Sequence, residues 1–330
     1  MDLDVVFLGT SASMPTAQRG TPALLIRRGG ERLLVDCGEG TQRQLLRSSI
    51  GLIELREVFL THYHADHYLG LPGMLKTFAL RGRDLPLTIY GPPGLRELFG
   101  ALRRVFGKVS FPLDLVELSP GADLEREDYT LRTFGVEHGV SAVGYALIED
   151  PRPGRFDVTR AEALGIPPGP ERGALQRGET VVLAGGRTIT PDEVVGPKRP
   201  GRTLVIAGDG VPSRPVLEVS QGADVLIHEA TFAVDESERA AETLHSTALA
   251  AAELARVAGV KLLALTHLSS RYFGPELAQE AREVFPDTVV PRDFDVIEIP
   301  YPDAGREGPA LVKGGAVQQR DRQPDRAAVP

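Results

Sequence analysis

Short apolar runs alternate with polar, glycine-rich and proline-rich segments along most of the chain. Runs rich in Val, Ile, Leu and Phe that are too short for helices predict strands at residues 5–8, 23–26, 32–37, 52–60, 87–90, 113–118, 129–136, 203–207, 224–227, 261–266 and 295–299. Helices are predicted at residues 42–47, 74–80, 95–105, 247–257 and 275–284. Strands that alternate with helices indicate an α/β protein.

Local signals set some boundaries of these elements. Residues 69–73 contain two glycines and a proline and predict a turn before the helix at 74–80. Ser246 or Thr247 is the predicted N-cap of the helix at 247–257, and Gly259 lies just beyond its end.

The pattern changes between residues 151 and 200, where proline and glycine become dense and long apolar runs disappear. This segment is either a long surface loop or an insertion that protrudes and binds a partner. Its eight basic and six acidic residues give a small positive excess in a chain of net charge −8. Residues 303–330 lack apolar periodicity and are predicted to be a disordered tail.

Composition narrows the class of protein. The chain is 42% hydrophobic and 25% charged, as in ordinary globular proteins, and it has no apolar run long enough to cross a membrane. The acidic N-terminus is unlike a secretory signal, and the single cysteine, Cys37, excludes an internal disulfide and fits a cytoplasmic protein. The negative net charge argues against non-specific binding of nucleic acid, DNA included.

The strongest chemical signal is a histidine cluster after the strand at 52–60. Three of the seven histidines, His62, His64 and His67, fall within six positions, together with Asp66. In an extended segment, His62 and His64 point the same way and can bind one metal ion. Asp66 and His67 follow a bend and can reach a second ion. Imidazole and carboxylate ligands suit zinc. The alternative is a polar turn with chance histidines, and three histidines and an aspartate within six positions argue against it.

Further candidates stand at the ends of other predicted elements. His138, His267 and Asp209 each follow a strand, where open α/β sheets place their sites. Each alone could be an ordinary turn residue, but together with the first cluster they are candidate metal ligands. His228 and His245 are either ligands or groups that support the ligands.

Five residues near these ligands are assigned other roles. His228 and Asp36 are candidates for supporting positions behind the ligands, and Glu229 for orienting an imidazole. His245 is either an acid/base group or a neighbour of a helix cap, and Cys37 is a small buried residue.

His62-x-His64-x-Asp66-His67 after an apolar strand resembles the signature of the metallo-β-lactamase superfamily. Further segments resemble one family within it, ribonuclease Z, the tRNA 3′-processing endonuclease. These segments are residues 7–12, 36–42, 59–62, 70–73, 154–158, 165–170, 228–232 and 245–247.

The resemblance implies an αββα sandwich, in which two central mixed sheets are flanked by helices, over residues 1–302. It also implies that residues 151–200 form a flexible arm that grips the tRNA elbow, with candidate contacts at Arg155, Phe156, Pro167, Pro168, Gly169 and Pro170. A homodimer is expected, in which the arm of one chain serves the site of the other.

The resemblance also assigns ligands for two zinc ions per chain, with Mn²⁺ as a substitute in assays. The first ion is bound by His62, His64, His138 and Asp209; the second is bound by Asp66, His67, Asp209 and His267. Asp66 is the implied proton acceptor, and His245 assists at the leaving oxygen with help from Glu229.

The sequence departs from the family pattern in one loop. The family's lysine and asparagine are missing from residues 15–20, which puts discrimination against CCA-bearing ends in question. Two rival functions fit the same residues. One is a phosphodiesterase or ester hydrolase for a small molecule, which would not need the arm. The other is a non-catalytic, metal-stabilised RNA-binding module, which would not need Asp66 and His245.

Overall fold

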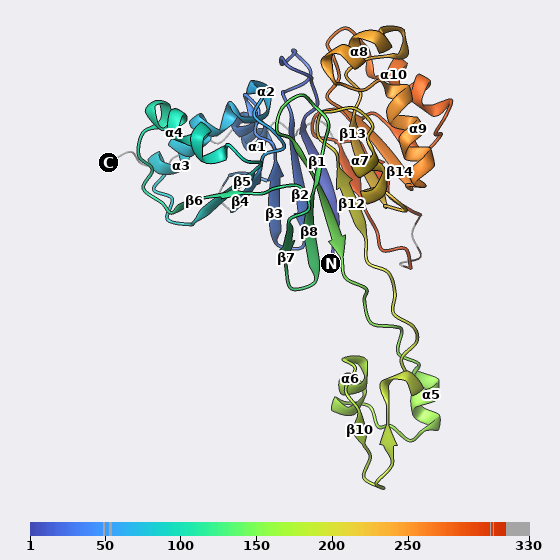
Figure 1. The fold of residues 1–330 in the computed structure, drawn as a ribbon. Coiled ribbons are helices and arrows are strands. Elements are labelled where there is room, and N and C mark those ends of the chain that lie inside the picture. The colour runs from blue at the N-terminus through green and yellow to red at the C-terminus, as the bar shows by residue number, and fades with distance from the viewer. Residues whose placement is uncertain (49, 53–54, 304, 306, 315–330) are drawn as a thin grey trace.

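The computed structural model describes the chain apart from residues 49, 53–54, 304, 306 and 315–330. Two mixed sheets pack face to face, and helices cover their outer surfaces (Figure 1). The predicted αββα sandwich is therefore confirmed. Within the described part, no helix is long and apolar enough to span a bilayer.

The first sheet has the strand order β17-β16-β1-β2-β3-β4-β5-β6, and β3 to β6 run parallel. Its strands are β1 (Leu3–Gly9), β2 (Ala23–Arg28), β3 (Glu31–Val35), β4 (Glu57–Phe59), β5 (Leu87–Gly91), β6 (Leu113–Glu117), β16 (Val296–Glu298) and β17 (Ala310–Val312). The helices on its outer face are α1 (Thr41–Arg47), α3 (Gly70–Leu80) and α4 (Leu95–Phe106).

The second sheet has the order β15-β14-β13-β12-β9-β8-β7, with β12 to β15 parallel. Its strands are β7 (Asp123–Glu125), β8 (Tyr129–Gly135), β9 (Val143–Glu149), β12 (Thr203–Ile206), β13 (Val225–Glu229), β14 (Leu262–Thr266) and β15 (Thr288–Val289). The helices on its outer face are α7 (Arg214–Val219), α9 (Ala248–Ala258) and α10 (Gly274–Arg282). Helix α2 (Ala65–Tyr68), helix α8 (Ser237–Thr243) and the 3₁₀ turn at Val234–Glu236 complete the body.

Most predicted elements are present, and the differences have local causes. As predicted, Thr247 caps α9, accepting a hydrogen bond from the Ala250 backbone N–H, and Gly259 ends the helix. The turn predicted at 69–73 is wrong, because α3 already begins at Gly70, and proline is tolerated in the first turn of a helix. A Cβ on Gly70 would lie 2.2 Å from the Gly38 carbonyl oxygen, so this glycine permits close packing instead.

Two predicted segments differ in extent from those in the structure. The strand predicted at 52–60 is limited to β4, and residues 53–54 lie outside the described residues. The prediction of a tail without structure is wrong for Ala310–Val312, which pairs with β16 through backbone hydrogen bonds that need no apolar periodicity. Residues 315–330 of the predicted tail also lie outside the described part.

Residues between β9 and β12 form an arm that hangs away from the sandwich (Figure 1). The arm is not a structureless loop, because it folds around buried Ala161, Ile166, Leu175, Ile189 and Val194. Its elements are α5 (Val158–Ala163), α6 (Pro170–Gln176), the hairpin of β10 (Val181–Val182) and β11 (Thr188–Ile189), and a 3₁₀ turn at Pro191–Glu193. They were missed because each is very short and because glycine- and proline-rich segments separate them.

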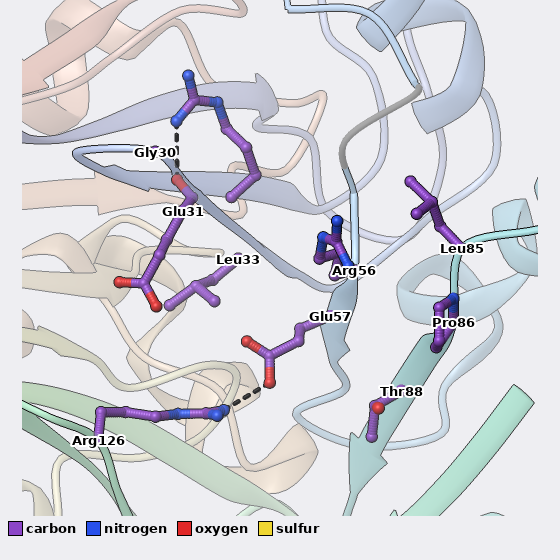
Figure 2. A pocket seen from close by; sticks show the side chains of 10 residues that line it. Gly30, Glu31, Leu33, Arg56, Glu57, Leu85, Pro86, Thr88 and Arg126 are labelled. Carbon is purple, nitrogen blue, oxygen red and sulfur yellow. Dashed lines mark hydrogen bonds and ion pairs between the residues drawn. The ribbon is translucent and has the colours of Figure 1, made fainter.

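An open cleft of about 630 Å³ lies at the amino-terminal ends of β3, β4 and β5 (Figure 2). Its carboxylates already have partners in the protein, since Glu57 pairs with Arg126 and accepts from the Tyr90 hydroxyl, while Glu31 accepts from the Tyr129 hydroxyl. The first histidine cluster follows the opposite, carboxyl-terminal end of β4. The cleft is therefore separate from the candidate site.

Glu149 anchors a buried ion-pair group where the arm leaves the body. Its carboxylate accepts hydrogen bonds from Arg202 at 2.6 and 2.7 Å and from Arg28 Nε at 3.0 Å. Burial alone would raise the pKa of Glu149, but Arg202 and Arg28 hold it below its usual value.

We expect Glu149→Gln to lower the free energy of unfolding by about 3–5 kcal/mol at neutral pH, because it leaves the buried Arg202 guanidinium without its carboxylate partner. Arg28 is left with Asp128 as its nearest carboxylate. Since the folded pKa is depressed, this stabilisation is present above the unfolded pKa and is lost as pH falls through the folded pKa. Urea unfolding of both proteins at neutral and acidic pH measures the difference, which should shrink in acid. Glu179→Gln, in an exposed pair with Arg177, is the control. Identical neutral curves for Glu149→Gln and the wild type would contradict the prediction.

Candidate metal centre and active site

Strand ends bring most of the candidate residues together at one edge of the sandwich. The first cluster follows β4, His138 follows β8, Asp209 follows β12 and His267 follows β14. His245 lies shortly before α9. Because these strands belong to both sheets, the site lies at the edge of the sandwich where the carboxyl-terminal ends of β4, β8, β12 and β14 meet.

His62, His64 and His138 form the first group of possible metal ligands. Their ligand atoms lie within 4.8 Å of one another, and His138 Nε2 is 3.1 Å from His64 Nδ1. His62 Nε2 is buried without a hydrogen-bond partner. Burial and neighbouring imidazoles, His67 first, lower the pKa of His62, so this ring is in the neutral form that binds a metal. An orphaned, neutral ring nitrogen among other imidazoles fits a metal ion well.

Asp66, His67 and His267 form the second group, again with ligand atoms within 4.8 Å. His267 Nε2 is 3.4 Å from Asp66 Oδ2, and His67 Nε2 is 3.7 Å from the same oxygen. One oxygen of Asp209 joins the two groups. It lies 3.2 Å from His67 Nε2, 3.0 Å from His267 Nε2 and 4.0 Å from His62 Nε2.

The outer ring nitrogens of these histidines are held by the protein. Nδ1 of His67 lies 2.8 Å from Asp36 Oδ2, and Nδ1 of His138 lies 3.0 Å from the Leu244 carbonyl oxygen. Both partners are acceptors, so each Nδ1 carries a proton and each Nε2 faces the clusters, where it would bind a metal ion in its deprotonated form. This is how proteins orient imidazole ligands, and it shows that the residues present fit a two-metal centre.

Asp36 supports the first cluster as well as His67. It accepts hydrogen bonds from the backbone N–H and the hydroxyl of Thr61, the residue before His62. Asp36 has a φ of 59° and His267 a φ of 54°, which are left-handed values that are costly for residues other than glycine. Two strained residues at strand ends place their side chains at the same site.

Glu229 and His245 form a hydrogen-bonded pair beside the metal ligands. His245 Nδ1 lies 2.7 Å from Glu229 Oε1, and Glu229 is fully buried. Burial would lower the pKa of His245, but the hydrogen bond and charge of Glu229 raise it overall. Across the described residues, Nε2 of His245 has no hydrogen-bond partner, and the ring stacks 5.5 Å from that of His267. This nitrogen is therefore free to contact a substrate.

His228 and Cys37 lie outside the ligand groups. His228 is buried at the end of β13, and its Nδ1 contacts the Glu229 carbonyl oxygen at 2.9 Å. Cys37 is fully buried, as predicted, and burial raises the pKa of its thiol.

Comparisons with known proteins agree with this geometry. The Metallo-beta-lactamase superfamily profile matches residues 17–267. The chain is 46% identical to ribonuclease Z of Methanosarcina acetivorans, over 91% of this chain and 99% of that protein. It is 47% identical to ribonuclease Z of Halobacterium salinarum, over 92% of this chain and 100% of that one. The chain belongs to the ribonuclease Z family. The structure of the short form of human tRNase Z aligns with a TM-score of 0.66 and 29% identity, over 90% of this chain and 99% of that one.

The sequence of this ribonuclease Z family member did not predict two threonines whose hydroxyl groups contact the histidine ligands. Thr231 Oγ1 lies 2.9 Å from His267 Nδ1 and donates to Glu229 Oε2. Thr61 Oγ1 plays the equivalent part beside His62 at 3.0 Å. Their one sequence signal is position, since Thr61 adjoins the histidine cluster and Thr231 lies two residues after Glu229.

The loop that departs from the family pattern borders the metal centre. Ser13, two residues before this loop, donates its backbone N–H to Asp66 Oδ2 at 2.9 Å. Arg19 is engaged within the protein, because Nη1 donates to Thr10 Oγ1 and to the Pro291 carbonyl oxygen. The arginine that this loop shares with the family therefore has a structural role here.

Proposed function

We propose that this chain is a metal-dependent endoribonuclease that removes 3′ trailers from precursor tRNA. The cut falls after the discriminator base and leaves a 3′-hydroxyl on the tRNA. Nearly full-length similarity to proteins named ribonuclease Z carries the choice of substrate. The two ligand groups joined by Asp209 support phosphodiester hydrolysis as the reaction.

Two zinc ions per chain are proposed, with Mn²⁺ as a substitute in assays. The first would be bound by His62, His64, His138 and Asp209; the second by Asp66, His67, Asp209 and His267. Nitrogen and carboxylate ligands without a thiolate fit zinc, and they also accept manganese.

The chain's own residues would hold and move the protons. When bound, a pair of divalent ions activates a water and neutralises charge on the attacked phosphodiester. Asp66, fixed by the Ser13 N–H, accepts the proton of the attacking water. His245 contacts the leaving oxygen through Nε2 and delivers its proton there. Glu229, buried and bonded to Nδ1, keeps the ring in that orientation.

The direct test is incubation with a precursor tRNA that carries a 3′ trailer, with and without a chelator, followed by mapping of the cut. Cleavage after the discriminator base, abolished by the chelator, is expected. Binding without cleavage would favour the RNA-binding module. Hydrolysis of small phosphodiesters alone would favour the small-molecule enzyme. A substrate pair with and without CCA tests the loop at residues 15–20.

Metal content is a separate prediction. Because the ligand groups provide two sites joined by Asp209, elemental analysis after purification without chelators should give close to two zinc ions per chain. His267→Ala should reduce this number, since His267 contacts both Asp66 and Asp209. Glu253→Ala on the exposed face of α9 is the control. Full activity in a preparation with no metal would exclude the assignment.

A cytoplasmic homodimer is also proposed. The arm leaves the amino-terminal end of β12, and Asp209 follows the carboxyl-terminal end of the same strand. The arm and the site of one chain therefore lie at opposite ends of the body, which favours an arm that serves the site of a second copy. The single buried cysteine fits a reducing compartment.

A further inference from the structure

Two chain segments, residues 150–156 and 195–202, join the arm to the body, and we call them the stalk. They pair with each other, since the backbone N–H groups of Arg152 and Arg199 donate to each other's carbonyl oxygens at 2.8 and 2.9 Å. A Cβ on Gly154 would lie only 1.9 Å from the Gly196 carbonyl oxygen. The two segments are therefore in direct contact close to the body.

Asp303, which lies between β16 and β17, binds both stalk segments. Its carboxylate forms ion pairs with Arg152 and, at 2.6 Å, with Arg199. Its backbone oxygen accepts a hydrogen bond from Arg155 Nη2 at 3.0 Å. Hydrogen bonds from Arg152 and Arg199 lower the pKa of Asp303 to about 2, so the carboxylate is ionised.

Tyr301 connects the stalk to the buried interior. The guanidinium carbons of Arg152 and Arg202 lie 3.5 and 3.8 Å from the centre of its ring. Two planar cations this close to one ring centre must lie on opposite faces, so the ring is held between them. Arg202 is itself fixed, because it pairs with Glu149 and donates to the Ile299 carbonyl oxygen at 2.9 Å.

We propose that Tyr301 and Asp303 form a clamp that sets the direction of the arm and thereby positions it for the substrate. An isolated surface ion pair contributes little to stability, but the clamp holds two stalk segments and a buried arginine together. The part concerning substrate rests on the proposed function. If the arm points in the competent direction for only a fraction of the time, the apparent affinity falls by that fraction.

The direction of the arm can be measured without any substrate. The wild-type cysteine is buried, so spin labels would attach at Ala184→Cys, in the exposed turn of the arm hairpin, and at Glu253→Cys, on the exposed face of α9. Pulsed electron paramagnetic resonance spectroscopy gives the distribution of distances between the two spin labels. We expect a narrow distribution with the intact clamp and a clearly broader one in Tyr301→Ala and Asp303→Asn. Tyr301→Phe, which keeps the ring, should retain the narrow distribution.

Kinetics provide the second measurement. In Tyr301→Ala and Asp303→Asn, KM for precursor tRNA should rise about tenfold while kcat stays near the wild-type value, because the metal ligands are untouched. Tyr301→Phe, which keeps the ring, should have a KM close to that of the wild type. Glu179→Gln removes a comparable ion pair inside the arm and is the matched control.

The two measurements separate the possible failures. Unchanged distances in both clamp variants would overturn the clamp, whatever the substrate. A broader distribution with unchanged KM would keep the clamp as an orienting device and overturn its part in positioning substrate. If the wild-type protein does not cut precursor tRNA, the distance measurement still decides whether the clamp exists.

Discussion

Asp66→Ala is expected to abolish cleavage of precursor tRNA while leaving tRNA binding almost intact. The change removes the proposed proton acceptor and one metal ligand, so kcat should fall by at least about 10³-fold. Most of the binding energy should come from the arm and from backbone contacts remote from the metal centre, so the Kd should stay within about threefold. Single-turnover cleavage and filter binding measure the two quantities separately.

The control is Asp235→Ala, which removes an exposed carboxylate from a 3₁₀ turn of the same chain. It should leave both quantities unchanged. Metal analysis of Asp66→Ala shows whether the second ion has been lost along with the proton acceptor. An equal loss of binding and cleavage in Asp66→Ala would show that the assigned division of roles is wrong.

Removal of the arm should weaken the binding of precursor tRNA and leave the metal centre intact, the reverse of the result expected for Asp66→Ala. Replacing residues 156–195 by a short Gly/Ser linker keeps Arg152 and Arg199 at the stalk and removes a unit that has its own small core. We therefore expect an intact body with its metal content unchanged. Cleavage of precursor tRNA should fall by orders of magnitude, mainly through lost binding.

Hydrolysis of a small chromogenic phosphodiester, where the wild type shows it, should persist in the arm-deleted protein because the metal centre remains. Survival of tRNA processing in a folded, arm-deleted protein would remove the arm from the proposed function. Mixing the arm-deleted chain with Asp66→Ala tests the homodimer. Cleavage regained on mixing is expected if the arm of one chain serves the site of another.

The sequence was informative where apolar runs were uninterrupted and where ligands followed them. Strand ends meet at one edge of a sheet, so the positions of His62, Asp209 and His267 directly after apolar runs were enough to group them in one site. Strand β9 lies outside the predicted strands, although it is central in the second sheet. Its Gly144 weakens the pattern, and close packing explains this glycine, since a Cβ there would lie 2.2 Å from the Phe134 ring.

Contacts between distant segments could not be predicted in the same way. The carbonyl oxygen of Leu244 reaches His138 only because the two loops meet in space. The clamp depends on Asp303, which lies in a segment with no periodic pattern, and on arginines far from it in sequence. Such contacts involve single polar atoms, and the hydropathy pattern of the sequence does not indicate which distant polar atoms meet.

The position of the arm between β9 and β12 also bears on how the chain folds. These strands are antiparallel neighbours, so the arm occupies the place of a hairpin turn. Closing a loop tenfold longer than a tight turn costs about 2 kcal/mol of additional chain entropy. The arm, however, has its own buried core, and its ends meet at Arg152 and Arg199. An arm that folds first brings β9 and β12 together as a short turn would, so the entropy of the long loop is no longer lost in the step that forms the sheet.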